Sequence, residues 1–479
     1  MKSKIRICYE NLTKEIKIWE WIIVLLAISL PLISFLYMDT NSIIRCGLDV
    51  VRSLASGQFL HFYDFAQESR WSGLMVHPPT YDILIYLVVA VWQLPVSIYE
   101  VVTGTTTEHS MIALVYSKYI LVLFLMASAY MIYKIAGKIG LTEKIAAWTA
   151  FAFLTGGFIA AYVCIAGQYD ILGIFFTLLG VFYYQKKDTK WFLIWFSIAV
   201  QFKFFALFIF IPLVLLRYKN LIHIAIQMVC VMIPTAILRI PFLNNLSVVT
   251  EKNEIQADML DRIFRNRIAI FESDVPLSLL FLGAVCLFCY WKDVKEKEWN
   301  YYCIFVPFLA VAMLFLSFPF LPYWLVYLAP WTALLFFMKR EKADRRFLFE
   351  LGMTVSIVLV QFSHFDWVFE LDNMAGMFVD KVIYSYEKFT NPLTMSNWNT
   401  ILPIEENEFL IYGMYILCLA AMILAYWPGK DLAEKGMEAQ EDSYPCRKMM
   451  WIRFIITFGI GCIPFLLYFG SIARQIISG

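Results

Sequence analysis

Four short polar segments interrupt a very apolar chain, and they contain side chains that can do acid–base chemistry or bind an anion. They lie at residues 38–41, 77–82, 167–170 and 201–204. The Asp39 carboxylate can take a proton from a hydroxyl group. The Lys203 ammonium can stabilise negative charge, and it lies inside an apolar run, where a charge is costly and usually functional. These residue types favour a catalytic or binding site if the fold brings the four segments together.

Each segment also allows a purely structural interpretation, which the sequence leaves open. Asp39 belongs to a residue type that caps helices, and Asp170 can cap the helix that follows a tight turn at Gly167. His77 can be an interfacial histidine before the helix that Pro78 and the next proline introduce. Lys203 can extend its charge to a membrane interface instead of binding a ligand.

The composition places these segments in a membrane protein. Hydrophobic residues make up 61% of the 479 residues and charged residues only 16%, with a formal net charge of +1. Soluble domains carry about 25% charged residues, so a soluble enzyme, a disordered chain and a nucleic-acid-binding domain are excluded. Apolar runs of about 20 residues predict helices rather than a β-barrel. The ten cysteines show no CxxC pairs or metal-ligand spacing, so we interpret them as core residues.

The apolar runs predict about 13 helical segments in an all-α polytopic fold. The first follows a basic stretch without a cleavage site, so it is expected to be an uncleaved helix. The 191–216 run is long and can instead be two short helices that meet at Gln201-Phe202-Lys203. The runs lie at residues 19–38, 80–98, 111–133, 146–166, 170–185, 191–216, 222–240, 275–291, 299–316, 321–338, 347–364, 408–427 and 451–472.

The basic residues predict which loops face the cytoplasm. The N-terminus, the turns near 134–144, 186–190, 217–219, 292–297 and 339–346, and a charged linker at 428–450 are expected inside. Three outer loops remain, at 39–79, 241–274 and 365–407. This assignment requires the 191–216 run to cross twice and the 80–98 run to be a half-helix that does not cross. A single crossing of 191–216 would put Lys186 and Lys187 outside, so we prefer the first version.

The first outer loop is expected to contain an amphipathic helix at the membrane surface. Its helix is predicted to be capped near Thr40 or Asn41 and to end at Gly57. Apolar residues recur at helical spacing and polar residues fall on the other faces. The apolar positions are Ile44, Leu48, Val51 and Leu54, and the polar positions are Ser42, Arg45, Asp49 and Arg52.

Over residues 15–220 the order of these segments resembles that of GT-C glycosyltransferases, in particular bacterial mannosyltransferase-like and arabinosyltransferase-like members. Asp39 after the first helix, the run ending at Gly57 and the motif His77-Pro78-Pro79-x-Tyr81 are similar to the family's first outer loop. Gly167-Gln168-Tyr169-Asp170 is similar to a Gly-Gln-Tyr/Phe-Asp pattern in one branch. Lys203 lies where such proteins often have Leu-x-Lys in a broken helix. The chain departs from the family at Thr40, where a second acid is usual, and at 320–324, where many relatives have a charged His-Glu-Arg-Tyr-like element.

The resemblance implies a GT-C-like catalytic module at residues 1–345, followed by C-terminal transmembrane helices at 346–479. It implies inverting transfer of a sugar from a polyprenyl-phosphate donor to a hydroxyl of a glycan, lipid or protein acceptor. The reaction would occur at the outer face of a bacterial plasma membrane, among membrane lipids and without nucleic acid. No cofactor is expected, and without a second acid beside Asp39 a divalent metal ion is not supported.

The resemblance also assigns roles to individual residues. Asp39 would be the general base. The donor phosphate would be bound by Lys203, His77, Arg262 and Arg265, and the sugar or acceptor by Tyr81, Gln168, Asp170 and Arg45. Six acids share the second outer loop with its arginines, so Arg262 and Arg265 can instead pair within that loop.

Two other classes of function remain open from the sequence. Lys203 and Asp170 at membrane depth can mark a substrate path, as in a transporter or lipid flippase. We find no inverted repeat in the sequence to support that reading. A polymerase or ligase of surface polysaccharide would use similar loops on a different fold.

Overall fold

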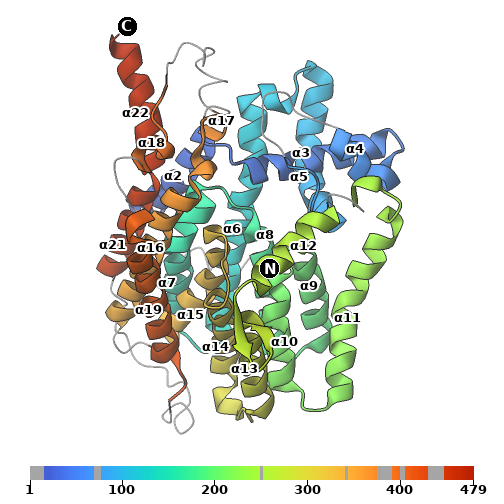
Figure 1. Cartoon of the computed structure of the whole chain (residues 1–479), viewed down its shortest axis with the longest axis vertical. Coiled ribbons are helices and arrows are strands. Elements are labelled where there is room, and N and C mark those ends of the chain that lie inside the picture. Colours follow the sequence, from blue (N-terminus) through green and yellow to red (C-terminus); the bar gives the residue numbers. More distant parts are fainter. Residues whose placement is uncertain are drawn as a thin grey trace.

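The helices of this protein form a bundle, and one of them, α3 (Met38–Ala55), lies across the others (Figure 1). The structure, a computed structural model, describes residues 16–68, 77–248, 252–339, 343–374, 377, 391–399, 405–429 and 447–478. Within these ranges six helices are long and apolar enough to cross a membrane, or up to nine if each of three bent helix pairs is one crossing. An all-α integral membrane protein is therefore confirmed, while the count of about 13 crossings stays a prediction.

The elements follow one another with short connections along most of the chain. The helices are α2 (Ile18–Ser34), α3 (Met38–Ala55), α4 (Phe62–Glu68), α5 (Ile83–Thr103), α6 (Met111–Lys138), α7 (Glu143–Leu154), a π-helical turn (Ile159–Ile165), α8 (Asp170–Gln185), α9 (Thr189–Phe202), α10 (Phe205–Arg217), α11 (Leu221–Arg239), α12 (Asn253–Phe264), α13 (Leu277–Trp291), α14 (Glu296–Phe315), a 3-10 turn (Pro322–Leu328), α15 (Ala329–Met338), α16 (Ala343–His364), α17 (Leu371–Met374), α18 (Met395–Asn399), α19 (Glu408–Tyr426), α21 (Arg447–Gly461) and α22 (Ile463–Ser478). Strands β1 (Arg267–Ile270) and β2 (Ser273–Pro276) form an antiparallel hairpin after α12.

Two uncertain apolar runs are settled by the helix boundaries. The 191–216 run is two short helices, α9 and α10, which meet at Lys203 and Phe204 as predicted, while two membrane crossings by this run stay a prediction. The half-helix expected at 80–98 is wrong. The α5 helix has 21 residues and is long and apolar enough to cross a membrane. The apolar sequence continues past Pro95 to the left-handed residue Gly104, which ends the helix.

Three of the basic turns lie together at one end of the bundle. Lys187 Nζ lies 2.5 Å from Glu296 Oε2, so the α8–α9 turn meets the start of α14. Arg217 donates a hydrogen bond of 2.8 Å to the carbonyl oxygen of Lys187. Lys219 donates one of 3.1 Å to the carbonyl oxygen of Lys292. This grouping is what the sorting of basic residues predicts for turns on one side of a membrane.

A sharp bend separates α2 from α3 and turns α3 across the bundle. The two helix axes differ by 78°. The carbonyl groups at the end of a helix lack partners within it, and here Leu32 and Phe35 accept hydrogen bonds from the buried Lys118 ammonium of α6. Lys118 therefore stabilises the bend between α2 and α3, which turns α3 across the other helices.

The polar side of α3 is buried within the protein instead of facing water, while the position of this helix at the membrane surface stays a prediction. Arg45 and Asp49 are both buried, with 3.6 Å between Arg45 Nε and Asp49 Oδ2. The α5 helix packs directly on α3. A Cβ atom on Gly47 would lie 2.5 Å from Val89 Cγ1, so glycine allows this close approach. The chain pairs the polar residues of α3 with each other and with α5, so an amphipathic pattern does not require a solvated face.

Candidate active site

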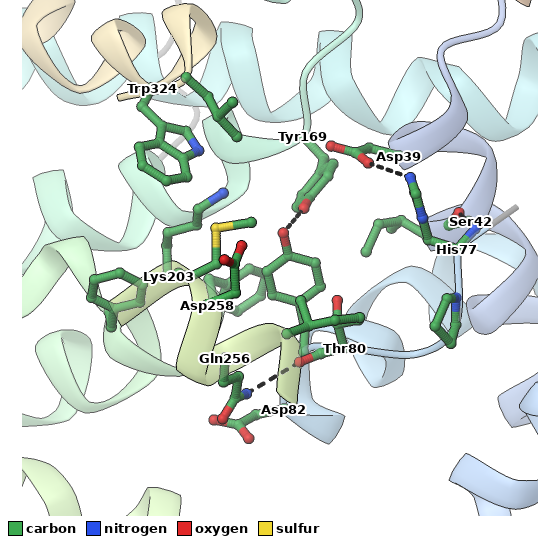
Figure 2. Close-up of a pocket in the computed structure, with 18 of the residues that line it drawn as sticks. Asp39, Ser42, His77, Thr80, Asp82, Tyr169, Lys203, Gln256, Asp258 and Trp324 are labelled. Atoms are coloured by element: carbon green, nitrogen blue, oxygen red, sulfur yellow. Dashed lines mark hydrogen bonds and ion pairs between the residues drawn. The ribbon is translucent and has the colours of Figure 1, made fainter. Parts of the chain in front are cut away.

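Asp39 and His77 face each other across the start of α3 (Figure 2). The helix begins at Met38 after Tyr37, and Asp39 lies in its first turn. The predicted helix cap near Thr40 or Asn41 is therefore wrong, and no side chain caps this end. His77 Nε2 lies 3.8 Å from Asp39 Oδ1. The carboxylate is thus turned toward a second titratable group.

The α3 helix also fixes the backbone of His77. The N–H of His77 donates to Ser42 Oγ at 2.7 Å, and its carbonyl oxygen accepts from Arg45 Nη2 at 3.2 Å. Arg45 is buried and does not line the cavity described below. The structure thus gives Arg45 a contact with the His77 backbone in place of the sugar or acceptor contact that the resemblance implies.

The turn at Gly167 brings a third segment to the same place. Gly167 has φ of +68°, as the predicted tight turn requires. Its carbonyl oxygen accepts a hydrogen bond of 2.5 Å from Thr40 Oγ1. Two residues later, the Tyr169 hydroxyl donates to the Tyr81 hydroxyl (Figure 2). Gln168 is buried and does not line the cavity.

The fourth segment contributes Lys203, which forms a buried ion pair. Lys203 Nζ lies 2.8 Å from Asp170 Oδ1, and the Lys203 side chain is only 8% exposed. The ring centroids of Tyr81, Tyr169 and Trp324 each lie 5.6 Å from the ammonium. Lys203 therefore does not extend to an interface. Asp170 begins α8 with its carboxylate toward Lys203 and does not cap that helix.

The four segments enclose one cavity of about 580 Å³. Its walls are largely apolar and aromatic, and it lies under α12, where Gln256 donates to the carbonyl oxygen of Thr80 at 3.1 Å (Figure 2). A cavity of this size fits a small ligand or a lipid headgroup. Of the residues predicted for the site, Asp39, His77, Tyr81, Lys203 and Arg262 line the cavity.

The arginines of the second outer loop pair within that loop, as their acidic neighbours allowed. Arg262 lines the cavity, but its Nη2 atom lies 3.8 Å from Oδ2 of Asp258, which is one turn earlier in α12. Arg265 is half-exposed, lies 3.6 Å from Asp261 Oδ2 and does not line the cavity. This arrangement therefore does not support the phosphate contact that the resemblance implies for Arg265.

The sequence missed a second charged cluster at the cavity wall. Asp82 Oδ1 and Oδ2 accept from Arg239 Nε and Nη2, both at 2.8 Å, and Lys252 Nζ lies 3.0 Å from Asp82 Oδ1. Asp82 and Arg239 line the cavity. The sequence feature that could have indicated this cluster was Asp82, at the end of the polar segment 77–82. Arg239 at the end of an apolar helix looks like an ordinary interface anchor.

Hydrogen bonds near Asp64 connect the first outer loop to the segment after α11. Asp64 Oδ1 accepts from the backbone N–H and the hydroxyl of Ser247, at 2.9 and 2.6 Å. Burial acts to raise the pKa of Asp64, but the hydrogen bonds from Ser247 and Leu246 outweigh it and hold that pKa below its usual value. Burial lowers the pKa of Lys252, although Asp82 opposes this shift.

Comparison with known proteins leaves the family of this chain open. No family model matches the chain, and no curated protein or solved structure matches it. The described residues contain no group of three or more His, Cys, Asp or Glu side chains that could hold a metal ion. The GT-C resemblance thus stays a prediction.

Proposed function

We propose that the protein is an inverting glycosyltransferase that moves a sugar from a polyprenyl-phosphate donor to an acceptor hydroxyl. The observation that supports this most is the cavity itself, which holds a carboxylate, Asp39, and a cation, Lys203, among aromatic walls. Aromatic rings suit the apolar faces of sugars, and a lipid donor suits a site among apolar helices. The site is proposed to lie at the outer face of a bacterial plasma membrane, with the N-terminus in the cytoplasm.

The proposed reaction is a single displacement at the anomeric carbon. The acceptor oxygen attacks that carbon from the face opposite the phosphate and forms the new C–O bond. Its proton passes to Asp39, which acts as the general base, and His77 at 3.8 Å can take the proton onward. The bond between the anomeric carbon and the phosphate oxygen breaks, and its electron pair leaves with the lipid phosphate.

Lys203 is proposed to stabilise the leaving phosphate, and Asp170 is proposed to orient the Lys203 ammonium. An ammonium has three N–H donors, of which Asp170 takes one. The others remain for the phosphate oxygens, in a setting where water is largely excluded and electrostatic stabilisation is strong. Asp170 is thus a positioning residue in this proposal, in place of the sugar contact implied by the resemblance.

The proposal is tested with purified protein, a panel of polyprenyl-phosphate sugars and candidate acceptors. We expect transfer with release of free polyprenyl phosphate and an inverted anomeric configuration in the product. Loss of a general base typically costs about 10²- to 10⁴-fold in rate, so Asp39→Asn should lower kcat at least 100-fold. Asp261→Asn, an exposed carboxylate outside the cavity, is the matched control. Full activity of a folded Asp39→Asn variant would refute the assignment of the base.

One observation also favours a transporter as the second candidate. A buried ion pair at a break between two short helices is a feature of transporter substrate sites, and Lys203 lies at such a break. Reconstituted vesicles distinguish the two functions. Saturable movement of a lipid-linked sugar across the membrane, without formation of a glycosidic bond, would favour the transporter and exclude the proposed reaction.

A further inference from the structure

Two cations converge on one carboxylate at the α11 end of the cavity. Asp82 holds the guanidinium of Arg239 by two hydrogen bonds of 2.8 Å. Lys252 Nζ lies 3.0 Å from Asp82 Oδ1 and 3.1 Å from the Tyr63 hydroxyl. One carboxylate balances one cation, so this cluster carries a surplus charge of about +1. Lys252 shares the Asp82 carboxylate with Arg239 at a buried position, where an incompletely balanced charge is costly.

The surplus charge faces the cavity. Arg239 lines the cavity and its side chain is 47% exposed, whereas Asp82 and Lys252 are buried. Within the described part of the chain, Arg239 Nη1 has no hydrogen-bond partner, because Asp82 engages only Nε and Nη2. The other carboxylate on this wall, Asp258, already lies near Arg262. A guanidinium fixed on one edge thus presents its other edge to a ligand.

The cluster also lies where an apolar helix surface meets the cavity. The α11 helix exposes large aliphatic side chains that include Ile233 and Ile237, and Ile240, the residue after Arg239, is exposed as well. Aliphatic side chains of α12, including Met259 and Leu260, line the cavity beside it. A ligand with a charged headgroup and an apolar tail matches this boundary, since the tail can follow α11 while the headgroup reaches Arg239.

We infer that Arg239, held in place by Asp82 and beside the buried charge of Lys252, binds the phosphate of a membrane lipid at a subsite distinct from Lys203. A phosphodiester carries one negative charge and a phosphomonoester about 1.5 to 2 at pH 7, so either can neutralise the surplus of the cluster. The phosphate can belong to the prenyl-phosphate donor or to a phosphorylated lipid acceptor. The assignment of the phosphate to a donor or an acceptor rests on the proposed glycosyltransferase function. Phosphate binding at Arg239 does not.

The subsite is tested by equilibrium binding of two probes to the full-length protein in neutral detergent. One probe is a short-chain prenyl phosphate and the other is a lysophosphatidic acid. A hydrogen bond to a charged group is worth enough that Arg239→Gln should weaken binding of at least one probe roughly 10- to 100-fold. Arg239→Lys should recover part of the loss by keeping the charge. Arg265→Gln, which removes an arginine outside the cavity, should bind both probes like the wild type.

Unchanged affinity for both probes in a folded Arg239→Gln variant would overturn the inference. If that variant does not fold, Lys252→Gln replaces it. Because this change removes the surplus charge of the cluster but keeps the guanidinium, affinity for at least one probe should still fall, and unchanged affinity for both probes would overturn the inference. Where sugar transfer is observed, a higher KM for the donor alone identifies the donor phosphate, and a higher KM for a phosphorylated acceptor alone identifies the acceptor.

The binding test and the transfer test fail independently. Absence of transfer with every donor would refute the proposed function and leave the phosphate subsite standing. Transfer that depends on Asp39, together with probe binding that ignores Arg239, would refute the subsite and leave the function standing.

Discussion

The geometry of the buried ion pair between Lys203 and Asp170 predicts how much protein stability changes when one partner is removed. At 2.8 Å and an effective dielectric constant of about 20, the two charges attract each other by about 6 kcal/mol. Desolvation consumes much of this energy, so the intact pair adds little to stability compared with two neutral side chains. Breaking the pair is different, because Asp170→Asn leaves an ammonium buried without its counter-charge.

The expected cost of Asp170→Asn follows from that asymmetry. Removing one partner of a buried pair typically costs about 3–5 kcal/mol. The aromatic rings around the ammonium, each with its centroid 5.6 Å away, attract it in the wild type and in the variant alike, so cation–π attraction does not change this difference. We therefore expect a loss of about 3–5 kcal/mol. The apparent melting temperature should fall by roughly 5 °C, allowing for a long chain.

A double-mutant cycle isolates the pair from other effects. Lys203→Met should cost a similar amount, because it leaves Asp170 buried and unpaired. The variant with both Lys203→Met and Asp170→Asn should lie within about 1 kcal/mol of the wild type, since no unpaired charge remains. The measurement is scanning fluorimetry of all four proteins in one detergent. If the two single losses simply add in the double variant, the residues do not form the pair and the reasoning fails.

Two further predictions concern the surroundings of the cavity. Because the pKa of Asp64 is held below that of an unfolded aspartate, its stabilising effect is complete above about pH 4 and is lost as the pH falls through the lower folded value. Melting temperatures from pH 7 to pH 3 should fall less steeply for Asp64→Asn, whereas parallel curves would contradict a role of the Ser247 hydrogen bonds. A Cβ on Gly180 would lie 2.4 Å from the Phe196 ring, so Gly180→Ala should separate α8 from α9 and cost about 1–3 kcal/mol. Gly283→Ala, which meets no atom within 4 Å, is the control in the same melting assay, and equal stability of the two variants would refute the clash.

The sequence predicted well those parts of the fold that depend on neighbouring residues. The two short helices that meet at Lys203 follow from a polar break in a long apolar run. The turn at Gly167 follows from a glycine that tolerates positive φ. The α5 helix was predicted wrongly, because its role was derived from counting crossings rather than from its own sequence. Its 21 residues, most of them apolar, form a regular helix that ends before Gly104, whatever number of crossings the whole chain makes.

Partners in the charged clusters were harder to predict, because they lie far apart along the chain. Asp82 and Arg239 are separated by 157 positions, and Asp82 and Lys252 by 170. Nothing near Arg239 distinguishes a guanidinium that faces a cavity from one that anchors a helix end at a membrane surface. The sequence shows that a charge in an apolar segment is costly to bury. Only the three-dimensional structure shows which charged side chains pair with one another.

Asp39 shows how a small shift in a helix boundary changes the meaning of a residue. A helix that began at Thr40 or Asn41 would make Asp39 a neighbour of the cap, with its carboxylate directed toward backbone N–H groups. The helix begins instead at Met38, so Asp39 lies within the first turn, where its charge still favours the helix dipole. Its carboxylate is then directed to His77 and the cavity. The capping and catalytic interpretations of this aspartate therefore differ by about two residues in the start of α3, and Asp39→Asn distinguishes them: a cap survives the change to asparagine, whereas a general base does not.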